Sequence, residues 1–234
     1  MLFEIASALV LVSLCIAEED ELCPKKLELD LNLTEEQRRI FLNGHNDLRR
    51  RIAEGTQPNK NGLPKLGPAK NMYALKWDCF NEVLAQESMA ACSLENPVDV
   101  SRNMMQMTNI PALNDSIYAH LAIDQWISQV MFFGKKEPTN VYDGTLCQFT
   151  NMVHANTTSV ACALKRCKDN VLVTCLYDKC GTKEKLMWEV GEPCKHDNDC
   201  TTFKDSKCSN GLCELKYDSY SFDYDEYDEE DESN

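Results

Sequence analysis

Thirteen cysteines in 234 residues constrain this chain more than any other feature. Cys15 lies in an N-terminal apolar run that predicts a cleavable signal peptide over residues 1–17 and is too short to span a bilayer. Its removal leaves 12 of the 13 cysteines, and an even, dense set in an exported chain predicts disulfide bonds. The predicted disulfide cysteines are Cys23, Cys79, Cys92, Cys147, Cys162, Cys167, Cys175, Cys180, Cys194, Cys200, Cys208 and Cys213.

The cysteine spacing also excludes one alternative. A zinc ribbon needs paired C-x-x-C knuckles, and the sequence contains none. Three glycosylation sequons, at Asn32, Asn114 and Asn156, support passage through the secretory pathway. We therefore predict a secreted, extracellular glycoprotein with no stable membrane insertion. With a formal net charge of −14, we expect no nucleic-acid partner.

Composition divides the chain into five segments. The signal peptide is followed by an acidic lead-in over residues 18–33 and a globular body over residues 34–178. Residues 179–215 are so rich in cysteine that this extension must be stapled by disulfides rather than held by an apolar core. Residues 216–234 have little to bury, and we predict that this tail is disordered.

The tail has a second property. Its nine acidic residues stand against one lysine, and tyrosines among carboxylates are typical of tyrosine sulfation. It is either a solubilising tail without a partner or an electrostatic hook for a basic surface on an extracellular protein. The candidate sulfotyrosines are Tyr217, Tyr220, Tyr224 and Tyr227.

The body shows three helical patterns. Thr34 and Gln37 form a capping box that begins the first helix, and Gly55 is a natural stop for it. Its apolar positions repeat at Ile40, Phe41, Leu48 and Ile52. Two further helices are predicted over residues 79–92 and from residue 114 or 115 to 133. Their apolar faces are assigned to Phe80, Val83, Leu84 and Ala91 in the second, and to Ile117, Leu121, Trp126, Val130 and Phe133 in the third.

Three β-rich runs follow the helices. The stretch LCQFTNMVHANTTSVACALKRC, residues 146–167, is interpreted as two strands, and NVLVTCLY as a third. Helices early in the chain and strands late predict an α+β layered fold in which helices cover a sheet.

Four stretches then match motifs of one family in the right order. GHNDLRRRIAEG carries HN-x-x-R-x-x-x-A-x-G, and NMYALKWDCFNEVLAQESMAAC carries M-x-x-L-x-W-D-C-x-x-E-x-x-A. FTNMVHANTTSVACALKRC is similar to Y-T-Q-x-V-W-x-x-[ST]-x-x-V-G-C-A, and VGEPCKHDNDCTTFKDSKCSNGLCE to a cysteine-rich extension. The chain thus resembles the CAP superfamily (SCP/TAPS), which includes venom allergens, antigen 5, cysteine-rich secretory and pathogenesis-related proteins. It most resembles the nematode activation-associated secreted and venom-allergen-like members.

The resemblance implies a fold and two disulfides. The fold is a three-layer α-β-α sandwich with a small disulfide-rich C-terminal extension. The suggested pairs are Cys79 with Cys147 and Cys162 with Cys167. We also expect the mature chain to have no free thiol, with the bonds of the extension separate from those of the body.

The family's cleft usually holds two histidines and two glutamates that can bind a divalent metal. The resemblance places these positions at Asn96, Arg102, Gln129 and Gln148. Amides are weak ligands for such ions, and an arginine repels a cation and cannot act as a base. We therefore predict no metal and no cofactor. Arg102 is expected to donate to the amide oxygens of the other three, an interpretation we prefer to a reused pocket for a small anion.

We find no other group of catalytic residues in the sequence that replaces the family's two histidines and two glutamates. His154 stands where the family usually has tryptophan, so we interpret it as a packed or rim residue, and no matched base lies beside a serine or cysteine. The resemblance favours a non-catalytic secreted binding protein that engages host immune or haemostatic proteins. The alternatives are an extracellular lipid or sterol carrier and, with least support, a metal-dependent hydrolase.

Overall fold

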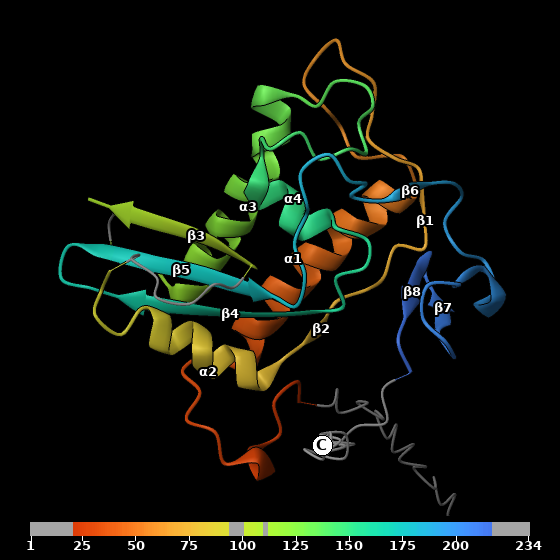
Figure 1. Ribbon diagram of the computed structural model, residues 1–234. Coiled ribbons are helices and arrows are strands. Elements are labelled where there is room, and N and C mark those ends of the chain that lie inside the picture. The colour runs from red at the N-terminus through yellow and green to blue at the C-terminus, as the bar shows by residue number, and fades with distance from the viewer. Residues whose placement is uncertain (1–20, 94–100, 110–111, 217–234) are drawn as a thin grey trace, which may run out of the picture.

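The computed structural model describes residues 21–93, 101–109 and 112–216. Its centre is a four-stranded sheet in the order β2-β4-β5-β3 (Figure 1). Strand β2 (Lys76–Trp77) runs parallel to β4 (Ser159–Arg166), whereas β4, β5 (Asn170–Tyr177) and β3 (Ser101–Thr108) are antiparallel neighbours. The two strands predicted after residue 158 are confirmed.

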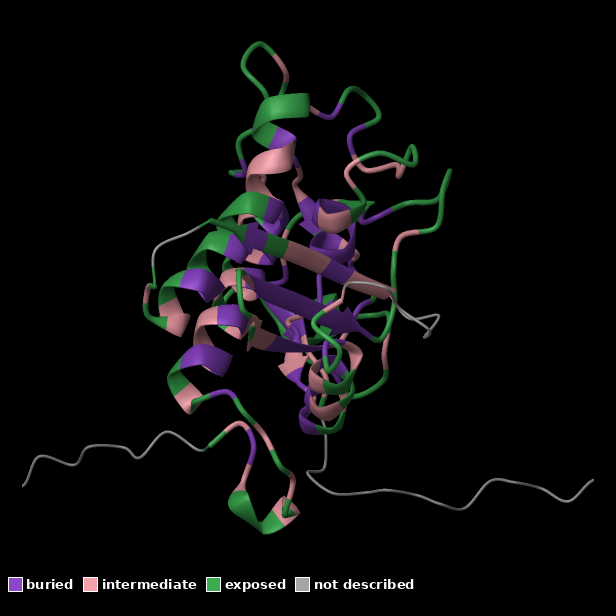
Figure 2. Cartoon of the chain, turned by 90° about the vertical axis from the view of Figure 1, so that its left-hand side faces the viewer, coloured by how far each residue is buried: buried purple, intermediate pink, exposed green. Residues whose placement is uncertain are grey.

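Helices cover both faces of this sheet. Helix α2 (Cys79–Ser88) packs on one face, and α1 (Glu35–Ala53), α3 (Asp115–Phe133) and α4 (Cys147–Val153) lie on the other (Figure 1). Side chains alternate along β5, so Leu172 and Leu176 pack under α2 while Val171 and Val173 join the larger core on the opposite side. Figure 2 shows the buried residues concentrated on the sheet and on the helix faces against it. The predicted α-β-α sandwich is confirmed.

Helix α1 begins where the sequence predicts. The side chain of Thr34 accepts a hydrogen bond from the Gln37 N–H at 3.2 Å, and the Gln37 side chain accepts one from the Thr34 N–H at 2.8 Å. Both partners of the capping box are therefore present. Phe41, Leu48 and Ile52 are fully buried, as their helical spacing predicts.

The buried faces of α2 and α3 differ from the prediction. Phe80 and Leu84 are 46% and 48% exposed, and α2 instead turns its small Ala85 and the carboxylate of Glu82 inward. In α3, Trp126 and Val130 are buried as predicted, but Ile117, Leu121 and Phe133 are 43%, 40% and 72% exposed. Apolar content alone misassigned these faces, because small residues allow close helix packing and an ion pair can satisfy a buried charge.

The first half of the stretch over residues 146–167 is a helix, which makes its assignment as a strand wrong. Helix α4 begins after Leu146, whose backbone is left-handed, and buries Phe149, Met152 and Val153 completely. These positions follow the i, i+3, i+4 spacing of a helix rather than the alternation of a strand. The second half forms β4, so the predicted strand pair is in fact a helix followed by a strand.

The last part of the extension, residues 194–215, packs as a small separate unit against the body. It contains the 3-10 turn η2 (Asp197–Asp199) and the hairpin of β7 (Lys207–Ser209) with β8 (Leu212–Glu214). Backbone hydrogen bonds join it to the body, from Ala74 N to Cys213 O at 2.7 Å and from Cys213 N to Met72 O at 2.8 Å. A two-stranded ladder of β1 (Ala69–Lys70) and β6 (Glu189–Val190) precedes it, and a short turn η1 (Lys25–Leu27) precedes α1.

Ten of the 12 cysteines form five disulfides. Both suggested pairings are wrong, because Cys79 bonds Cys23 and Cys162 bonds Cys175 across β4 and β5. The expectation that bonds of the extension and body are separate is met. Among the described residues Cys147 and Cys180 have no disulfide, which departs from the expectation that all 12 are bonded. The remaining pairs are Cys92–Cys167, Cys194–Cys208 and Cys200–Cys213.

In the part of the chain that the structure describes, no helix is both long and apolar enough to cross a membrane.

Candidate functional site

The predicted cleft positions come from three different elements. Gln129 lies on α3, Gln148 is at the start of α4, and Arg102 lies on the edge strand β3. Asn96 falls outside the described residues. The structure brings Gln129 and Gln148 together, since the Gln129 amide Nε2 donates to Oε1 of Gln148.

A short polar network surrounds this amide pair. Gln148 Nε2 donates to the Met104 carbonyl at 2.7 Å, and Asn103 Nδ2 donates to the Gln148 carbonyl at 2.9 Å. Asn151 on α4 donates to Asn103 Oδ1 at 3.0 Å. Both asparagines are buried, and sequence reasoning did not select them. Their signal was present, because an asparagine inside an apolar strand or helix needs a buried partner.

The predicted role of Arg102 is wrong for both described amides. The donor to Gln148 Oε1 is Gln129, and Oε1 of Gln129 is buried without a hydrogen-bond partner among the described groups. The reason lies in the register of β3. Arg102 is paired with Leu176, which packs under α2, whereas Asn103 is paired with Cys175 in the core on the other side. Strand alternation therefore directs the Arg102 side chain to the α2 side. Burial lowers the pKa of its guanidinium below its ordinary value.

Arg49, a residue of the matched first-helix motif, occupies the centre of the molecule. Its guanidinium is fully buried and donates to five backbone carbonyls at 2.5 to 3.0 Å. Burial lowers the pKa of Arg49 to about 9, so the group stays charged at neutral pH. All of its donors are used within the protein, so it holds loops together and does not present a charge to a ligand. The acceptors belong to Tyr73, Met152, His154, Ala155 and Thr157.

His45, from the same motif, is held neutral. Its Nδ1 lies 2.7 Å from the Phe41 carbonyl, which can only accept, so Nδ1 carries the proton. Nε2 then accepts from the Tyr177 hydroxyl at 2.8 Å. Burial lowers the pKa of His45 to about 4 and raises the pKa of Tyr177 well above 10. Both ring nitrogens are engaged, which leaves none to act on a substrate.

His154 is half-buried. Its pKa is lowered to about 4, first by burial and then by the positive charges of Arg49 and Lys179. Its Nδ1 lies 3.3 Å from the Thr157 hydroxyl. The interpretation as a packed or rim residue agrees with this placement.

A buried ion pair anchors α2 to α1. Glu82 is fully buried and accepts from Arg38 Nε at 2.7 Å and from the Trp77 indole N–H at 2.7 Å. The second carboxylate oxygen, Oε1, accepts from Nη2 of Arg38 at 3.0 Å. This carboxylate is saturated by donors and is a structural group rather than a general base.

Metal-ligand geometry occurs in one place among the described residues. Cys194, Cys200 and Cys213 bring their sulfur atoms within 4.8 Å of one another. All three are already bonded in the disulfides of the extension, so they offer no thiolate to a metal. At the described cleft positions no imidazole or carboxylate stands in for the family's ligands.

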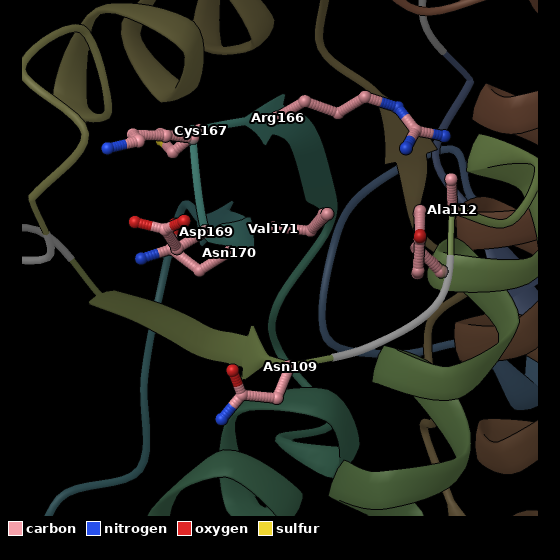
Figure 3. A pocket seen from close by; sticks show the side chains of 9 residues that line it. Asn109, Ala112, Arg166, Cys167, Asp169, Asn170 and Val171 are labelled. Atoms are coloured by element: carbon pink, nitrogen blue, oxygen red, sulfur yellow. The ribbon is translucent and has the colours of Figure 1, made fainter.

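A hollow of about 330 Å³ lies where β4 ends and β5 begins (Figure 3). Arg166 extends over it, yet its guanidinium pairs with Asp115 at 2.5 Å and lies 5.0 Å from the centre of the Tyr118 ring. The charge of Arg166 is thus paired within the protein, and the second cation of the lining, Lys168, is adjacent in sequence to Asp169.

The three sequons lie on the surface. Asn32, Asn114 and Asn156 are all exposed. Asn114 also caps α3 by accepting from the Ser116 N–H through Oδ1, and a glycan on Nδ2 would leave that bond in place. Glycosylation stays a prediction, and the four candidate sulfotyrosines lie outside the described residues.

The sandwich, the first-helix motif and the disulfide-bonded extension define a class of protein. The chain belongs to the CAP family, because residues 42–177 match the model of the cysteine-rich secretory protein family. Among curated relatives, Ancylostoma secreted protein of Ancylostoma caninum is 37% identical over 188 residues, which cover 77% of this chain and 43% of the relative. CRISP/Allergen/PR-1 of Trittame loki is 30% identical over 173 residues, which cover 66% of this chain and 41% of the relative.

Solved structures agree with this assignment. Na-ASP-1 superposes with a TM-score of 0.73 at 34% identity, and the match covers 80% of this chain and 47% of that one. BmVAL-1 superposes with a TM-score of 0.73 at 26% identity, and the match covers 80% and 98%. The chain therefore spans less than half the length of the first curated relatives and nearly all of BmVAL-1.

Proposed function

We propose that this chain is a secreted CAP protein that acts by binding other extracellular proteins and not by catalysis. The observation that carries the proposal is the amide pair of Gln129 and Gln148, which stands where the family usually has a glutamate and a histidine. Two amides that hydrogen-bond each other supply neither a metal ligand of useful strength nor a general base. Relatives named as secreted or venom proteins, together with the predicted signal peptide and the sequons, support an extracellular location.

Zinc calorimetry tests the loss of the family's metal site. We expect no stoichiometric heat from the tag-free wild-type chain. The matched variant is Gln129→Glu with Gln148→His, which restores a carboxylate and an imidazole at adjacent positions. A gain of zinc binding in this variant would support the assignment of these two positions. Stoichiometric binding in the wild type that is lost on Gln148→Ala would contradict the proposal.

We propose that the partner is an extracellular protein with a basic surface. The acidic tail carries a net charge of −8, nine carboxylates against one lysine, and electrostatic steering would raise the association rate. Pull-down from plasma and leukocyte surface extract with the glycosylated chain would identify the partner. A variant with the nine acidic residues changed to amides keeps the tail's length and is the control. If the wild type and this variant associate with the partner equally fast at low salt, the tail does not act as an electrostatic hook.

A lipid carrier is the second candidate, and one feature favours it. A groove of about 720 Å³ runs between α1 and α3. Its floor holds Ile123 and Ile127, and Gly44 lets the two helices approach closely, because an added Cβ would lie 2.8 Å from Ile123 Cγ2. Charged residues such as Arg39 and Asp47 form part of its wall.

A fluorescent fatty acid tests this candidate. Saturable binding should be lost in Ile127→Glu and kept in Leu84→Glu, which places the same charge on the exposed face of α2. Equal binding by both variants would exclude the groove as a lipid site.

A further inference from the structure

Cys147 and Cys180 differ from the other cysteines of the described chain. Both are exposed and neither has a disulfide partner, whereas the remaining ten form five bonds. Cys147 is the first residue of α4, and Cys180 follows the end of β5. Neither cysteine is used by the proposed binding function.

The two cysteines lie on segments that run side by side. The chain that leaves β5 passes along α4 (Figure 1). A Cβ added at Gly181, the residue after Cys180, would collide with Cγ2 of Thr150, and Thr150 is one helical turn after Cys147. Residues i and i+3 of a helix share a face, so Cys147 and Thr150 point to the same side.

Tyr142 lies between the same two segments. The Gly181 position is also 3.3 Å from Cδ1 of the Tyr142 ring. Backbone hydrogen bonds from Tyr142 N to Lys185 O at 2.9 Å and from Glu184 N to Tyr142 O at 2.7 Å tie the segments together. The pKa of the Tyr142 phenol is raised, first by burial and then by the charges of Cys147, Asp143 and Cys180. Cys147 and Cys180 therefore both lie near this phenol.

We propose that Cys147 and Cys180 are a redox pair that closes to a sixth, intramolecular disulfide. One thiolate attacks a small-molecule or protein disulfide, such as oxidised glutathione, and forms a mixed disulfide. The second thiolate then displaces the oxidant's remaining sulfur. The two cysteines lose two electrons and two protons, and the oxidant is reduced to two thiols. Exposure of both sulfurs gives the oxidant access that buried cysteines lack.

Closure of this bond would clamp the start of α4. Cys147 directly precedes Gln148, whose side chain bonds Gln129 and Met104. The chain after Cys180 is exposed from Thr182 to Leu186, and its backbone bonds include those of Glu184 and Lys185 with Tyr142. The disulfide would fasten this segment to the helix that carries the amide pair. The redox state of the pair would then set how rigidly that site is held.

Peptide mapping of the mature chain, without the predicted signal peptide of residues 1–17 and its Cys15, tests the pair. The protein is equilibrated with oxidised glutathione, denatured without reductant and alkylated with N-ethylmaleimide. Trypsin releases Cys180 in the peptide CGTK, and a second cleavage after Phe149 separates Cys147 from Cys162. We expect no alkylated cysteine and a CGTK peptide bonded to the Cys147 peptide. Two alkylated thiols, a bond from Cys147 to another cysteine, or a disulfide-linked dimer would each overturn the proposal.

Serine variants supply the controls. Cys147→Ser and Cys180→Ser should each leave one alkylated thiol, and the double variant none. Cys92→Ser breaks an existing bond and should free Cys167 while leaving the CGTK link intact. Amide hydrogen exchange over residues 182–186 should be several-fold faster in the double serine variant than in the oxidised wild type. An unchanged exchange rate would show that the bond forms without clamping the segment and would overturn that part of the proposal.

Discussion

The body and the extension are held together in different ways. The body buries a continuous apolar core around a fully buried arginine and a buried ion pair. The disulfide-bonded unit of the extension, residues 194–215, contributes three cysteines to a small buried cluster whose fourth buried residue, Tyr73, belongs to the body. Its two disulfides each close a short loop, with sequence separations of 14 and 13. A domain of this size lacks the apolar area to fold by burial alone, so covalent bonds replace the missing core.

The largest effect is expected in the body, from Arg49→Met. This change keeps much of the side-chain volume but leaves five buried carbonyls without their donor. Unsatisfied buried acceptors are costly, and we expect a loss of about 4 kcal/mol or more in the free energy of unfolding. Urea denaturation measures it. Arg49→Lys keeps the charge but not the planar guanidinium, so it should lose less stability than Arg49→Met. Equal stability of the wild type and both variants would refute a stabilising role for the Arg49 hydrogen bonds.

A disulfide comparison separates the two regions directly. Cys200–Cys213 in the extension and Cys162–Cys175 in the sheet have the same sequence separation of 13. Loop entropy alone predicts a similar loss of about 3 kcal/mol for each. We expect Cys200→Ala with Cys213→Ala to unfold the extension alone, because its small buried cluster loses a cross-link while the body keeps its own core. Cys162→Ala with Cys175→Ala should leave the strands paired.

Hydrogen exchange resolves the two outcomes of that comparison. In the first double variant, protection should disappear over residues 194–215 and persist in β4 and β5. The second should lower the melting temperature of the whole body without local loss of protection. If the extension stays protected without Cys200–Cys213, its contacts with the body and its remaining disulfide suffice, and the contrast between the two regions fails.

A smaller effect follows from His45 in the body. Its folded pKa of about 4 is below the unfolded value of 6.5, so the unfolded chain binds the proton more readily between these values. The stability is complete above pH 6.5 and is lost as pH falls from 6.5 towards 4. We expect about 2 kcal/mol less stability from this group at pH 5 than at pH 7.5. Urea denaturation at both values measures it, and His45→Gln should flatten the slope. An unchanged slope would mean that other groups cause it.

The smallest effect concerns the entry to α1. Thr34→Ala removes the acceptor for the Gln37 N–H and should cost about 1 kcal/mol, whereas Thr34→Ser keeps an oxygen in place. Thermal unfolding followed by circular dichroism measures both variants. Hydrogen exchange in residues 194–215 should not change in either, since the cap belongs to the body. Faster exchange there would mean that the two regions unfold together.

The sequence by itself determined the layers and much of α1. Capping and helical spacing are local signals, so Thr34, Gln37 and the buried Phe41, Leu48 and Ile52 could be read directly. Strands β4 and β5 were also identified, because their apolar runs are long enough to be distinct. The family motifs added the sandwich and the positions of Gln129 and Gln148.

Only the tertiary structure decided how these parts meet. Residues 147–153 could be read as a strand or a short helix, and packing of Phe149, Met152 and Val153 against the core selected the helix. Disulfide partners depend on distances between chain segments that spacing does not encode, so Cys23–Cys79 and Cys162–Cys175 were not foreseen. The register of β3 turned Arg102 away from the amides, because one residue along a strand reverses the face to which a side chain points.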